Sequence, residues 1–183
     1  MSKFAVIDTE TNWIDQVMSV GIVVADDREF EVVDKKYVIF EAEADIGGMY
    51  YDTLNIDGIE SETTDRVSGV QILYEFLKRN NVEHIFAYNA SFDYNHMPEL
   101  RGFLWHDIMK IAAYKQYNHA IPCTADCFKT GRMKSGYGVE SVLNMFGECG
   151  YCELHNALAD AVDELRIMKY LDYSVKDYPD LKS

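Results

Sequence analysis

The sequence has 183 residues, 48% of them hydrophobic and 13% aromatic, which fits one folded domain and excludes a disordered chain. No apolar run approaches the ~18 residues of a membrane-spanning helix, and the N-terminus lacks the basic and apolar regions of a secretory signal, so we expect a cytoplasmic protein with no membrane contact. The net charge of −14 argues against a broad basic face for long nucleic acid, but not against an enzyme that holds a few nucleotides through metal ions.

Segments rich in β-branched and aromatic residues open the chain, with a charged turn between the last two. We expect three sequential antiparallel strands over residues 3–9, 17–26 and 29–40. A polar stretch with glycine turns follows at 41–65, and we expect it to be a mobile loop.

The rest of the chain alternates between helical and extended patterns. Apolar residues spaced by three and four predict helices, over 66–81, 139–147 and 157–173, with a further helix over 110–117. Strands are predicted over 82–89 and 103–109, a short helix or loop over 91–100, and a loop over 123–138. A meander followed by alternating helices and strands predicts an α/β domain with helices packed on a mixed sheet.

Two acids, Asp8 and Glu10, come at the end of the first predicted strand. Being two residues apart, they point to the same face if the strand continues. Close carboxylates repel one another unless a proton or a cation lies between them. One interpretation is therefore a shared cation, and the other is a pair of solvated acids at a strand end.

Two later motifs carry further polar candidates. Asp93 follows the predicted strand "HIFAYN", in the kind of place where ligands of α/β sheets gather, although an aspartate there also caps helices. His155 lies five residues before Asp160, near the start of the last helix. Imidazole changes charge near neutral pH and so suits a proton acceptor, while a solvated histidine beside a surface aspartate is the alternative. His96 is a rival base that lacks this spacing.

In this order, "VIDTET", "YNASFD" and "HNALADA" resemble the motifs of the DEDDh, or DnaQ-like, 3′-to-5′ exonucleases of the ribonuclease H-like superfamily. The resemblance covers nearly the whole chain, since "WHDIMKIA" and "YGVESVLNMFG" also follow the family's order of parts. It implies a ribonuclease H-like mixed five-stranded sheet, with parallel strands after the antiparallel meander and helices on its faces. It also implies a single exonuclease domain over residues 1–183.

The resemblance implies hydrolysis at the 3′ end of single-stranded or short RNA or DNA, with release of nucleoside 5′-monophosphates. The family holds two Mg²⁺ or Mn²⁺ ions with four acids, matched here by Asp8, Glu10, Asp93 and Asp160. Asp8 is implied to bridge both ions, Glu10 and Asp160 to hold the ion that activates water, and Asp93 to support the site partly through water. His155 is implied to take the proton from that water. The alternative is a non-catalytic nucleic-acid-binding or assembly module of the same fold, and some relatives are homodimers.

The family reads the terminal sugar with the backbone just after the first acids, which here corresponds to Thr9, Thr11 and Asn12. Many members have a glycine close behind, whereas this chain has Asn12-Trp13. Trp13 is expected either to stack on the terminal base or to be a partly buried anchor. Asn89 of the second motif is a further candidate for substrate binding.

Four cysteines lie in one third of the chain, and their CxxxC and CxxC spacings loosely match a four-thiolate zinc site: Cys123, Cys127, Cys149 and Cys152. We favour four ordinary thiols over a zinc-stapled scaffold, and over a disulfide in a reducing cytoplasm. The only basic stretch contains Lys129, Arg132 and Lys134, and is expected to be either a phosphate-gripping loop or a solvated one.

Overall fold

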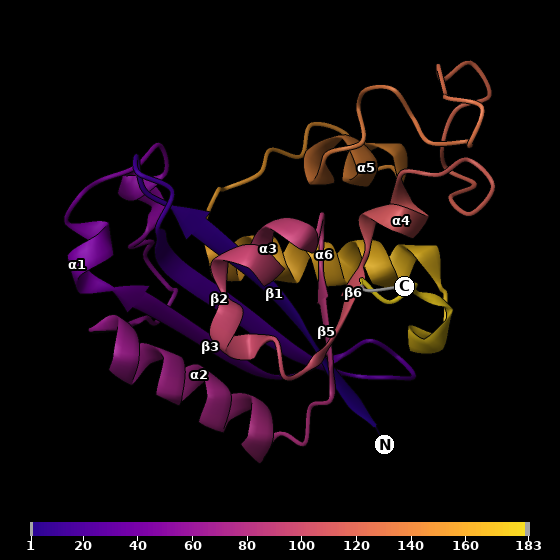
Figure 1. The fold of residues 1–183 in the computed structure, drawn as a ribbon. Coiled ribbons are helices and arrows are strands. Elements are labelled where there is room, and N and C mark those ends of the chain that lie inside the picture. The colour runs from indigo at the N-terminus through magenta and orange to yellow at the C-terminus, as the bar shows by residue number, and fades with distance from the viewer. Residues whose placement is uncertain (1, 182–183) are drawn as a thin grey trace.

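The computed structural model describes residues 2–181 and contains a six-stranded sheet between helices (Figure 1). The strands are β1 (Lys3–Thr11), β2 (Val17–Asp26), β3 (Val32–Phe40), β4 (Glu62–Thr64), β5 (His84–Ala87) and β6 (Leu104–Asp107). Their order across the sheet is β4-β3-β2-β1-β5-β6. β1, β2 and β3 form the expected antiparallel meander. The other three strands pair in parallel: β4 with β3, β5 with β1, and β6 with β5.

The helices are α1 (Glu41–Ala44), α2 (Arg66–Arg79), α3 (Ser91–His96), α4 (Met109–Ala112), α5 (Val139–Met145) and α6 (Ala157–Leu171). Short 3₁₀ turns cover Tyr51–Thr53, Pro98–Leu100 and Val175–Asp177. The predicted α/β architecture with a mixed sheet is confirmed, with one strand more than expected.

Three elements differ from the expectation. The stretch 41–65, expected to be a mobile loop, contains α1, a 3₁₀ turn and the extra strand β4, which pairs with the end of β3. β1 runs on to Thr11, because its backbone pairing with β2 continues through both acids. The helix expected over 110–117 ends at Ala112, and Tyr114 instead forms a bridge with Arg132 in the following loop.

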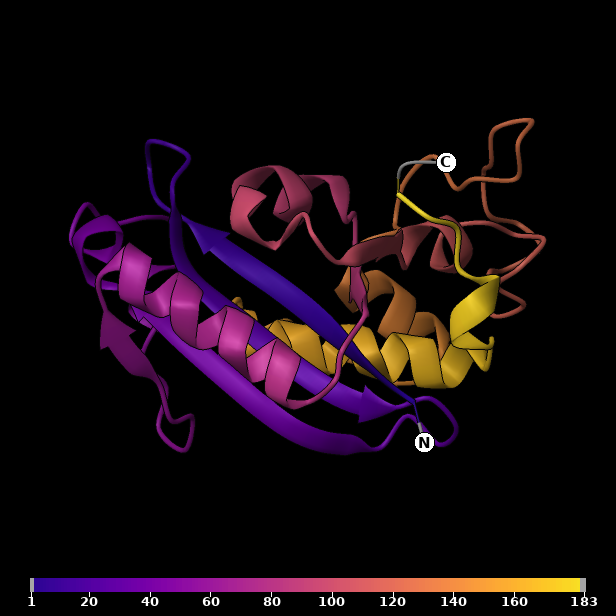
Figure 2. The same cartoon turned by 60° about the horizontal axis from the view of Figure 1, so that its bottom comes forward.

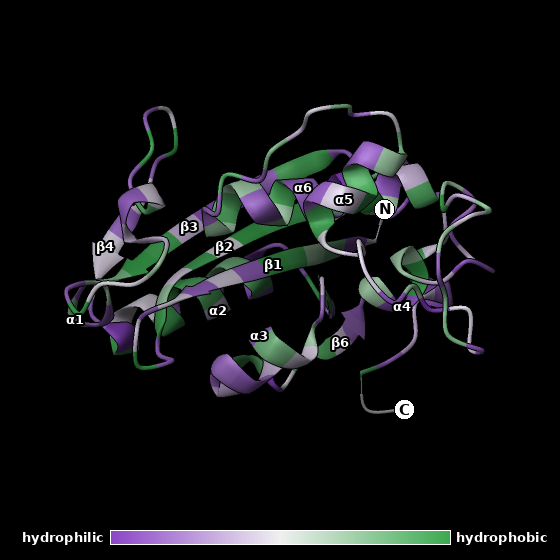
Figure 3. Ribbon diagram, turned by 90° about the horizontal axis from the view of Figure 1, so that it is seen from above, coloured by the Kyte–Doolittle hydropathy of each residue, from purple (hydrophilic) through white to green (hydrophobic). Residues whose placement is uncertain are grey.

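The sheet is covered on both faces, with α2 on one side and α6 on the other (Figure 2). Side chains alternate along β1, so Phe4 and Val6 pack on the α6 side while Ala5 and Ile7 pack on the α2 side. β2 is buried over its whole length, which explains its continuous apolar sequence. In Figure 3 the hydrophobic first half of β1 gives way to hydrophilic residues toward its end, where the acids lie.

Helix α6 approaches the sheet most closely at Gly21 of β2. A Cβ at this position would lie 2.2 Å from the Ala157 carbonyl oxygen and 2.3 Å from the Leu158 nitrogen. Gly21 pairs with Asp8 across β1 and β2. The absence of a side chain at Gly21 therefore brings the first turn of α6 against the part of the sheet that carries Asp8.

The end of the described chain lies along the edge strand β6. Asp180 forms an antiparallel bridge with His106, and the Leu181 amide donates to the Trp105 carbonyl at 2.8 Å. Within residues 2–181, no helix combines the length and the apolar character needed to cross a membrane.

The close approach at Gly21 gives a first prediction. Gly21→Ala should lower the free energy of unfolding by about 3 kcal/mol. The added methyl group would overlap the backbone of the first turn of α6, so the helix would have to move away from the sheet. The matched control is Gly102→Ala, since nothing lies within 4 Å of a Cβ there, and its change should stay within about 1 kcal/mol. Urea unfolding measures both, and equal stabilities of the two variants would contradict the contact.

Candidate functional site

The first and third motifs meet where the end of β1 faces the start of α6. Glu10, His155 and Asp160 each offer one ligand atom, and these atoms lie within 4.8 Å of one another. Glu10 and Asp160 are buried, whereas His155 is half-buried. Two segments from opposite ends of the chain therefore form one site.

The second motif joins the same site through α3. The Thr9 hydroxyl donates a hydrogen bond to Oδ1 of Asp93 at 2.7 Å, and both side chains are buried. The pKa of Asp8 is raised well above its usual range by desolvation and by the nearby carboxylates of Glu164, Asp93, Glu10 and Asp160. The four acids named by the motifs are thus neighbours.

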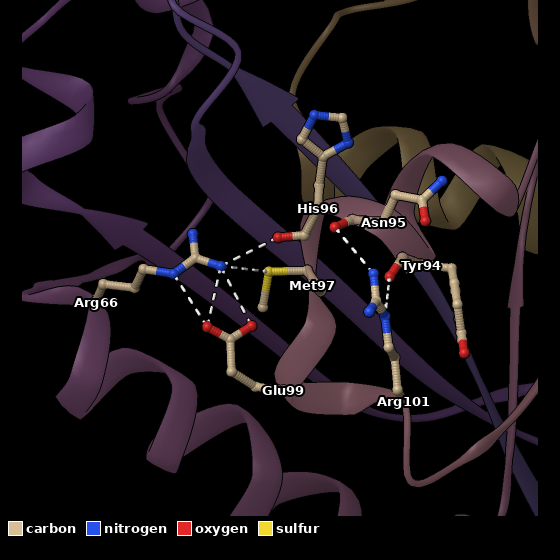
Figure 4. A network of polar contacts seen from close by, with 7 residues as sticks. All are labelled: Arg66, Tyr94, Asn95, His96, Met97, Glu99 and Arg101. Carbon is tan, nitrogen blue, oxygen red and sulfur yellow. Dashed lines mark hydrogen bonds and ion pairs between the residues drawn. The ribbon is translucent and has the colours of Figure 1, made fainter.

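Helix α3, which carries Asp93, is held in place by an arginine from the first turn of α2 (Figure 4). The Arg66 guanidinium donates to both carboxylate oxygens of Glu99 at 3.2 Å and to the His96 carbonyl at 3.1 Å. Arg101 donates to backbone carbonyls at the end of α3. These contacts satisfy carbonyls at the end of the short helix and fix the segment that presents Asp93.

The start of α6 is fixed by Asn156, a residue of the third motif with no role assigned in the sequence analysis. Its side-chain oxygen accepts from the Leu158 and Ala159 amides at 3.2 Å, and its amide group donates to the Thr53 carbonyl at 2.7 Å. Asn156 is therefore the N-cap of the helix and its link to the 3₁₀ turn after β3. This cap sets the position of His155 relative to Asp160.

The charges of the site suit a cation. Burial, followed by repulsion from neighbouring carboxylates, raises the pKa of Glu10 to about 8 and that of Asp160 to about 8. Burial raises the pKa of Asp93 to about 7, against the opposing effect of its hydrogen bond from Thr9. Oδ1 of Asp160 is buried without a hydrogen-bond partner among the described residues. An all-carboxylate set with an unsatisfied oxygen fits a hard divalent ion such as Mg²⁺ or Mn²⁺.

A fifth buried acid, Glu164, was missed by the sequence analysis. It lies one helical turn after Asp160, is only 2% exposed, and has its pKa raised well above the usual range by burial and by the carboxylates of Asp93 and Asp160. Its Oε2 accepts the Tyr88 amide at 3.0 Å. The signal in the sequence was an acid four residues after Asp160, on the same face of a helix that packs on the sheet.

A second missed acid, Asp107, holds the other side of the same turn. Its Oδ1 accepts the amides of Asn89 at 3.1 Å and Met109 at 3.0 Å. Tyr88 and Asn89 lie between β5 and α3, so two buried carboxylates fix the turn that leads to Asp93.

The substrate candidates at the tip of β1 differ in exposure. The Asn12 side-chain oxygen accepts from the Ile14 and Gln16 amides, and its amide group donates to the Glu43 carbonyl at 3.0 Å. Asn12 therefore shapes the hairpin between β1 and β2. Trp13 is 66% exposed, which leaves its ring available for stacking, and both roles expected for it, stacking on the base or acting as a partly buried anchor, stay predictions.

The remaining substrate candidates differ in their contacts and exposure. The Thr9 hydroxyl is engaged by Asp93, and Thr11 is half-buried at the end of β1. Asn89 is exposed and adopts a left-handed backbone with φ of 62°. His96 lies near Asp93, whose pKa its charge lowers, but its own Nε2 is 3.0 Å from Oδ1 of Asp15 in the β1–β2 hairpin.

The cysteines and the basic stretch lie outside the site. All four thiols are free, and within residues 2–181 none belongs to a group of three side chains that could hold a metal ion. In the basic stretch Lys134 pairs with Asp126 at 3.1 Å, and the Arg132 guanidinium lies 4.7 Å from the centre of the Tyr137 ring. A phosphate-gripping role for this stretch stays a prediction.

Neither the models of known protein families nor the curated proteins include a match to this sequence. Solved structures do match. A 3′-exonuclease recognising the 3′ end of a histone mRNA stem-loop has a TM-score of 0.65 and 13% identity, covering 92% of this chain and 80% of that one. The nuclease domain of 3′hExo bound to rAMP, described as a DEDDh family member, has a TM-score of 0.60 and 13% identity, with 92% and 90% covered.

Escherichia coli exonuclease I in complex with an oligonucleotide has a TM-score of 0.63 and 15% identity, and the match covers 93% of this chain but 40% of that protein. One of these neighbours is described as a member of the DEDDh family, which the three motifs resemble, and the other two are described as a 3′-exonuclease and as exonuclease I. At these identities the likeness concerns the fold, and it confirms the ribonuclease H-like sheet.

The raised pKa values predict how the stability of the metal-free protein depends on pH. Carboxyl groups of unfolded chains titrate near pH ~4, whereas Glu10 and Asp160 have pKa values of about 8 in the fold. Between these values the folded protein binds more protons than the unfolded chain, so stability falls as pH rises through this window. With a chelator present, the thermal midpoint should therefore drop from pH 5 to pH 8.

Adding Mg²⁺ or Mn²⁺ at pH 8 should reverse the drop, because a cation offsets the repulsion. Asp160→Asn should flatten the pH dependence and weaken the response to metal, whereas the exposed Asp57→Asn should leave both unchanged. Thermal scans measure all of these, and a metal-free midpoint that rises from pH 5 to pH 8 would contradict the clustered acids.

Glu164 gives a separate stability prediction. Glu164→Leu should cost about 1 to 3 kcal/mol, because it leaves the buried Tyr88 amide without its acceptor. Glu164→Gln keeps an acceptor and removes one buried acid, so at pH 8 without metal it should be at least as stable as the wild type. Urea unfolding distinguishes the two, and equal losses in both variants would count against the role of the hydrogen bond.

Proposed function

We propose that this chain is a metal-dependent 3′-to-5′ exonuclease that removes nucleoside 5′-monophosphates from single-stranded or short RNA or DNA. The observation that carries the proposal is the convergence of Asp8, Glu10, Asp93, His155 and Asp160, from three separate motifs, at one point of the fold. The neighbours with this fold include exonucleases solved with a histone mRNA stem-loop and with an oligonucleotide. We assign residues 1–183 to one catalytic domain.

The acids would hold two Mg²⁺ or Mn²⁺ ions, with Asp8 shared between them, Glu10 and Asp160 on one, and Asp93 in support. When bound, such ions supply positive charge that stabilises the attacking and leaving oxygens of an in-line displacement at phosphorus. The donor set supports this assignment because all four acids present oxygen ligands, and burial makes their uncompensated charge costly.

His155 acts as the general base. One of its ring nitrogens lies within 4.8 Å of a carboxylate oxygen of Glu10 and of Asp160, so a water between them is within reach of the imidazole. The water oxygen bonds to the phosphorus of the terminal phosphodiester, and His155 takes the proton from the water. The bond to the 3′ oxygen of the preceding nucleotide breaks, and that oxygen takes a proton from solvent to become a 3′ hydroxyl. The product is a nucleoside 5′-monophosphate and a strand one nucleotide shorter.

The terminal nucleotide would lie against the tip of β1. Trp13 offers an exposed indole for stacking on the base, and the backbone from Thr9 to Asn12 borders the acids on the same strand. Asn89, exposed in the turn before α3, would be a further contact for the substrate.

Digestion of 5′-labelled RNA and DNA, single- and double-stranded, with Mg²⁺ or Mn²⁺ tests the proposal. A ladder that shortens from the 3′ end is expected, and a chelator should abolish it. A circular single strand has no 3′ end and should survive. Internal cuts in the circle, or no cleavage of any substrate, would overturn the exonuclease assignment.

Asp8→Asn is the matched variant for the metal assignment. It keeps the shape of the side chain and removes its charge, so the cleavage rate should fall by about a thousandfold or more while the fold is kept. Asp57→Asn serves as the control, because Asp57 is exposed in the loop before β4. Undiminished cleavage by Asp8→Asn would contradict the role of the acids, and binding without cleavage by the wild type would favour the non-catalytic module.

A further inference from the structure

The catalytic histidine lies on a segment without regular secondary structure. Residues 146–156 connect α5 to α6, and His155 itself adopts a left-handed backbone with φ of 53°. Within residues 2–181 its imidazole forms no hydrogen bond. Something other than a hydrogen bond to the ring must therefore keep the imidazole turned toward the acids.

The contact that the ring does make is with Tyr50. The two rings are stacked, with centroids 4.1 Å apart and planes at 18°. Tyr50 is half-buried at the start of the 3₁₀ turn after α1. Parallel stacking at this distance restricts rotation of the imidazole about its side-chain bonds.

The same turn also holds the backbone of the histidine. The Thr53 hydroxyl lies within hydrogen-bonding distance of the His155 carbonyl, and the Thr53 carbonyl accepts the side-chain amide of Asn156 at 2.7 Å. One short turn thus contacts the ring, the carbonyl and the following residue of His155.

The turn itself is anchored to the strand that carries the first acids. The Gly47 carbonyl accepts the Trp13 amide at 3.1 Å, and a Cβ at Gly48 would lie 2.7 Å from the Thr11 carbonyl oxygen. Tyr50 also faces the acids, because burial and then the charges of Glu10, Glu153 and Asp160 raise the pKa of its hydroxyl. The end of β1 and His155 are therefore connected through residues 47–53.

We infer that Tyr50 is a positioning residue for the reaction, which stacks on His155 and, with the Thr53 hydrogen bond, holds the imidazole in the orientation needed to accept a proton. The inference rests on the proposed function. It assigns a role in catalysis to a segment that belongs to none of the three motifs and that carries no ligand of the metal site.

Replacement of the ring should lower the rate of the chemical step. Tyr50→Leu removes the stack and should reduce kcat about ten- to hundredfold. KM should change little, because the general base acts in the transition state and does not contribute to substrate binding. Tyr50→Phe keeps the stack and should stay within about threefold of the wild type. Tyr51→Leu is the matched control, because Tyr51 is the adjacent tyrosine, is 48% exposed and has no ring contact with any residue from 2 to 181.

A double-mutant cycle separates positioning from a general structural effect. In a His155→Ala background, Tyr50→Leu should cause no further loss of kcat, because the two residues act as one unit. Thr53→Val, which removes the hydroxyl that reaches the His155 carbonyl, should give a smaller loss that also vanishes in this background. Thermal midpoints identify any variant that loses activity by unfolding. If Tyr50→Leu proves to be unfolded, Thr53→Val alone tests the inference.

Proton NMR of the metal-free protein provides a readout that needs no activity. Ring-current shifts of the His155 imidazole protons should be present in the wild type, Tyr50→Phe and Tyr51→Leu, and lost in Tyr50→Leu. If the wild type cleaves, two results would overturn the inference alone. One is a Tyr50→Leu variant that cleaves as well as the wild type, and the other is a further loss of kcat when Tyr50→Leu is added to His155→Ala. A wild type that cleaves nothing overturns the proposed function and the inference with it.

Discussion

The contact between α6 and the backbone of β2 at Gly21 is the constraint on which the rest of the site depends. It places the first turn of α6 against the strand pair that carries Asp8, at a distance that no other residue type at position 21 permits. Asp160 and Glu164 then project from successive turns of this helix toward the sheet. With a larger residue in place of the glycine, the helix would sit farther out and the acids of the third motif would no longer reach those of the first.

That geometry carries an electrostatic cost. Five carboxylates share a region shielded from water, and burial together with mutual repulsion raises their pKa values. The fold offsets part of the cost with hydrogen bonds, from Thr9 to Asp93 and from the Tyr88 amide to Glu164. In the metal-free protein bound protons offset the remaining repulsion, which is the meaning of the raised pKa values, and a bound cation would take the place of those protons.

The sequence motifs select side chains that lie close together in the fold, but they do not select the residues that hold those side chains in place. Short motifs with fixed spacing beside recognisable strands and a helix predict Asp8, Glu10, Asp93, His155 and Asp160, and these residues lie near one another. Asn156 and Tyr50 were missed because their partners, Thr53 and His155, lie about a hundred positions away, and no local pattern encodes such contacts. Glu164 had a local signal in its spacing from Asp160, but its partner, the Tyr88 amide, lies 76 positions away. The extent of β1 and the extra strand β4 were missed for a related reason, since backbone pairing with a neighbour extends a strand through residues whose side chains do not favour it.

The pairing of the last described residues with β6 has a consequence for assembly. A free edge strand is a template for another chain, and β6 is one of the two edges of this sheet. Asp180 and Leu181 occupy the hydrogen-bonding groups of His106 and Trp105 on that edge. A second copy of this chain would therefore have to displace residues 180–181 to pair with this part of β6, whereas the β4 edge and the helical faces carry no such obstacle among the described residues.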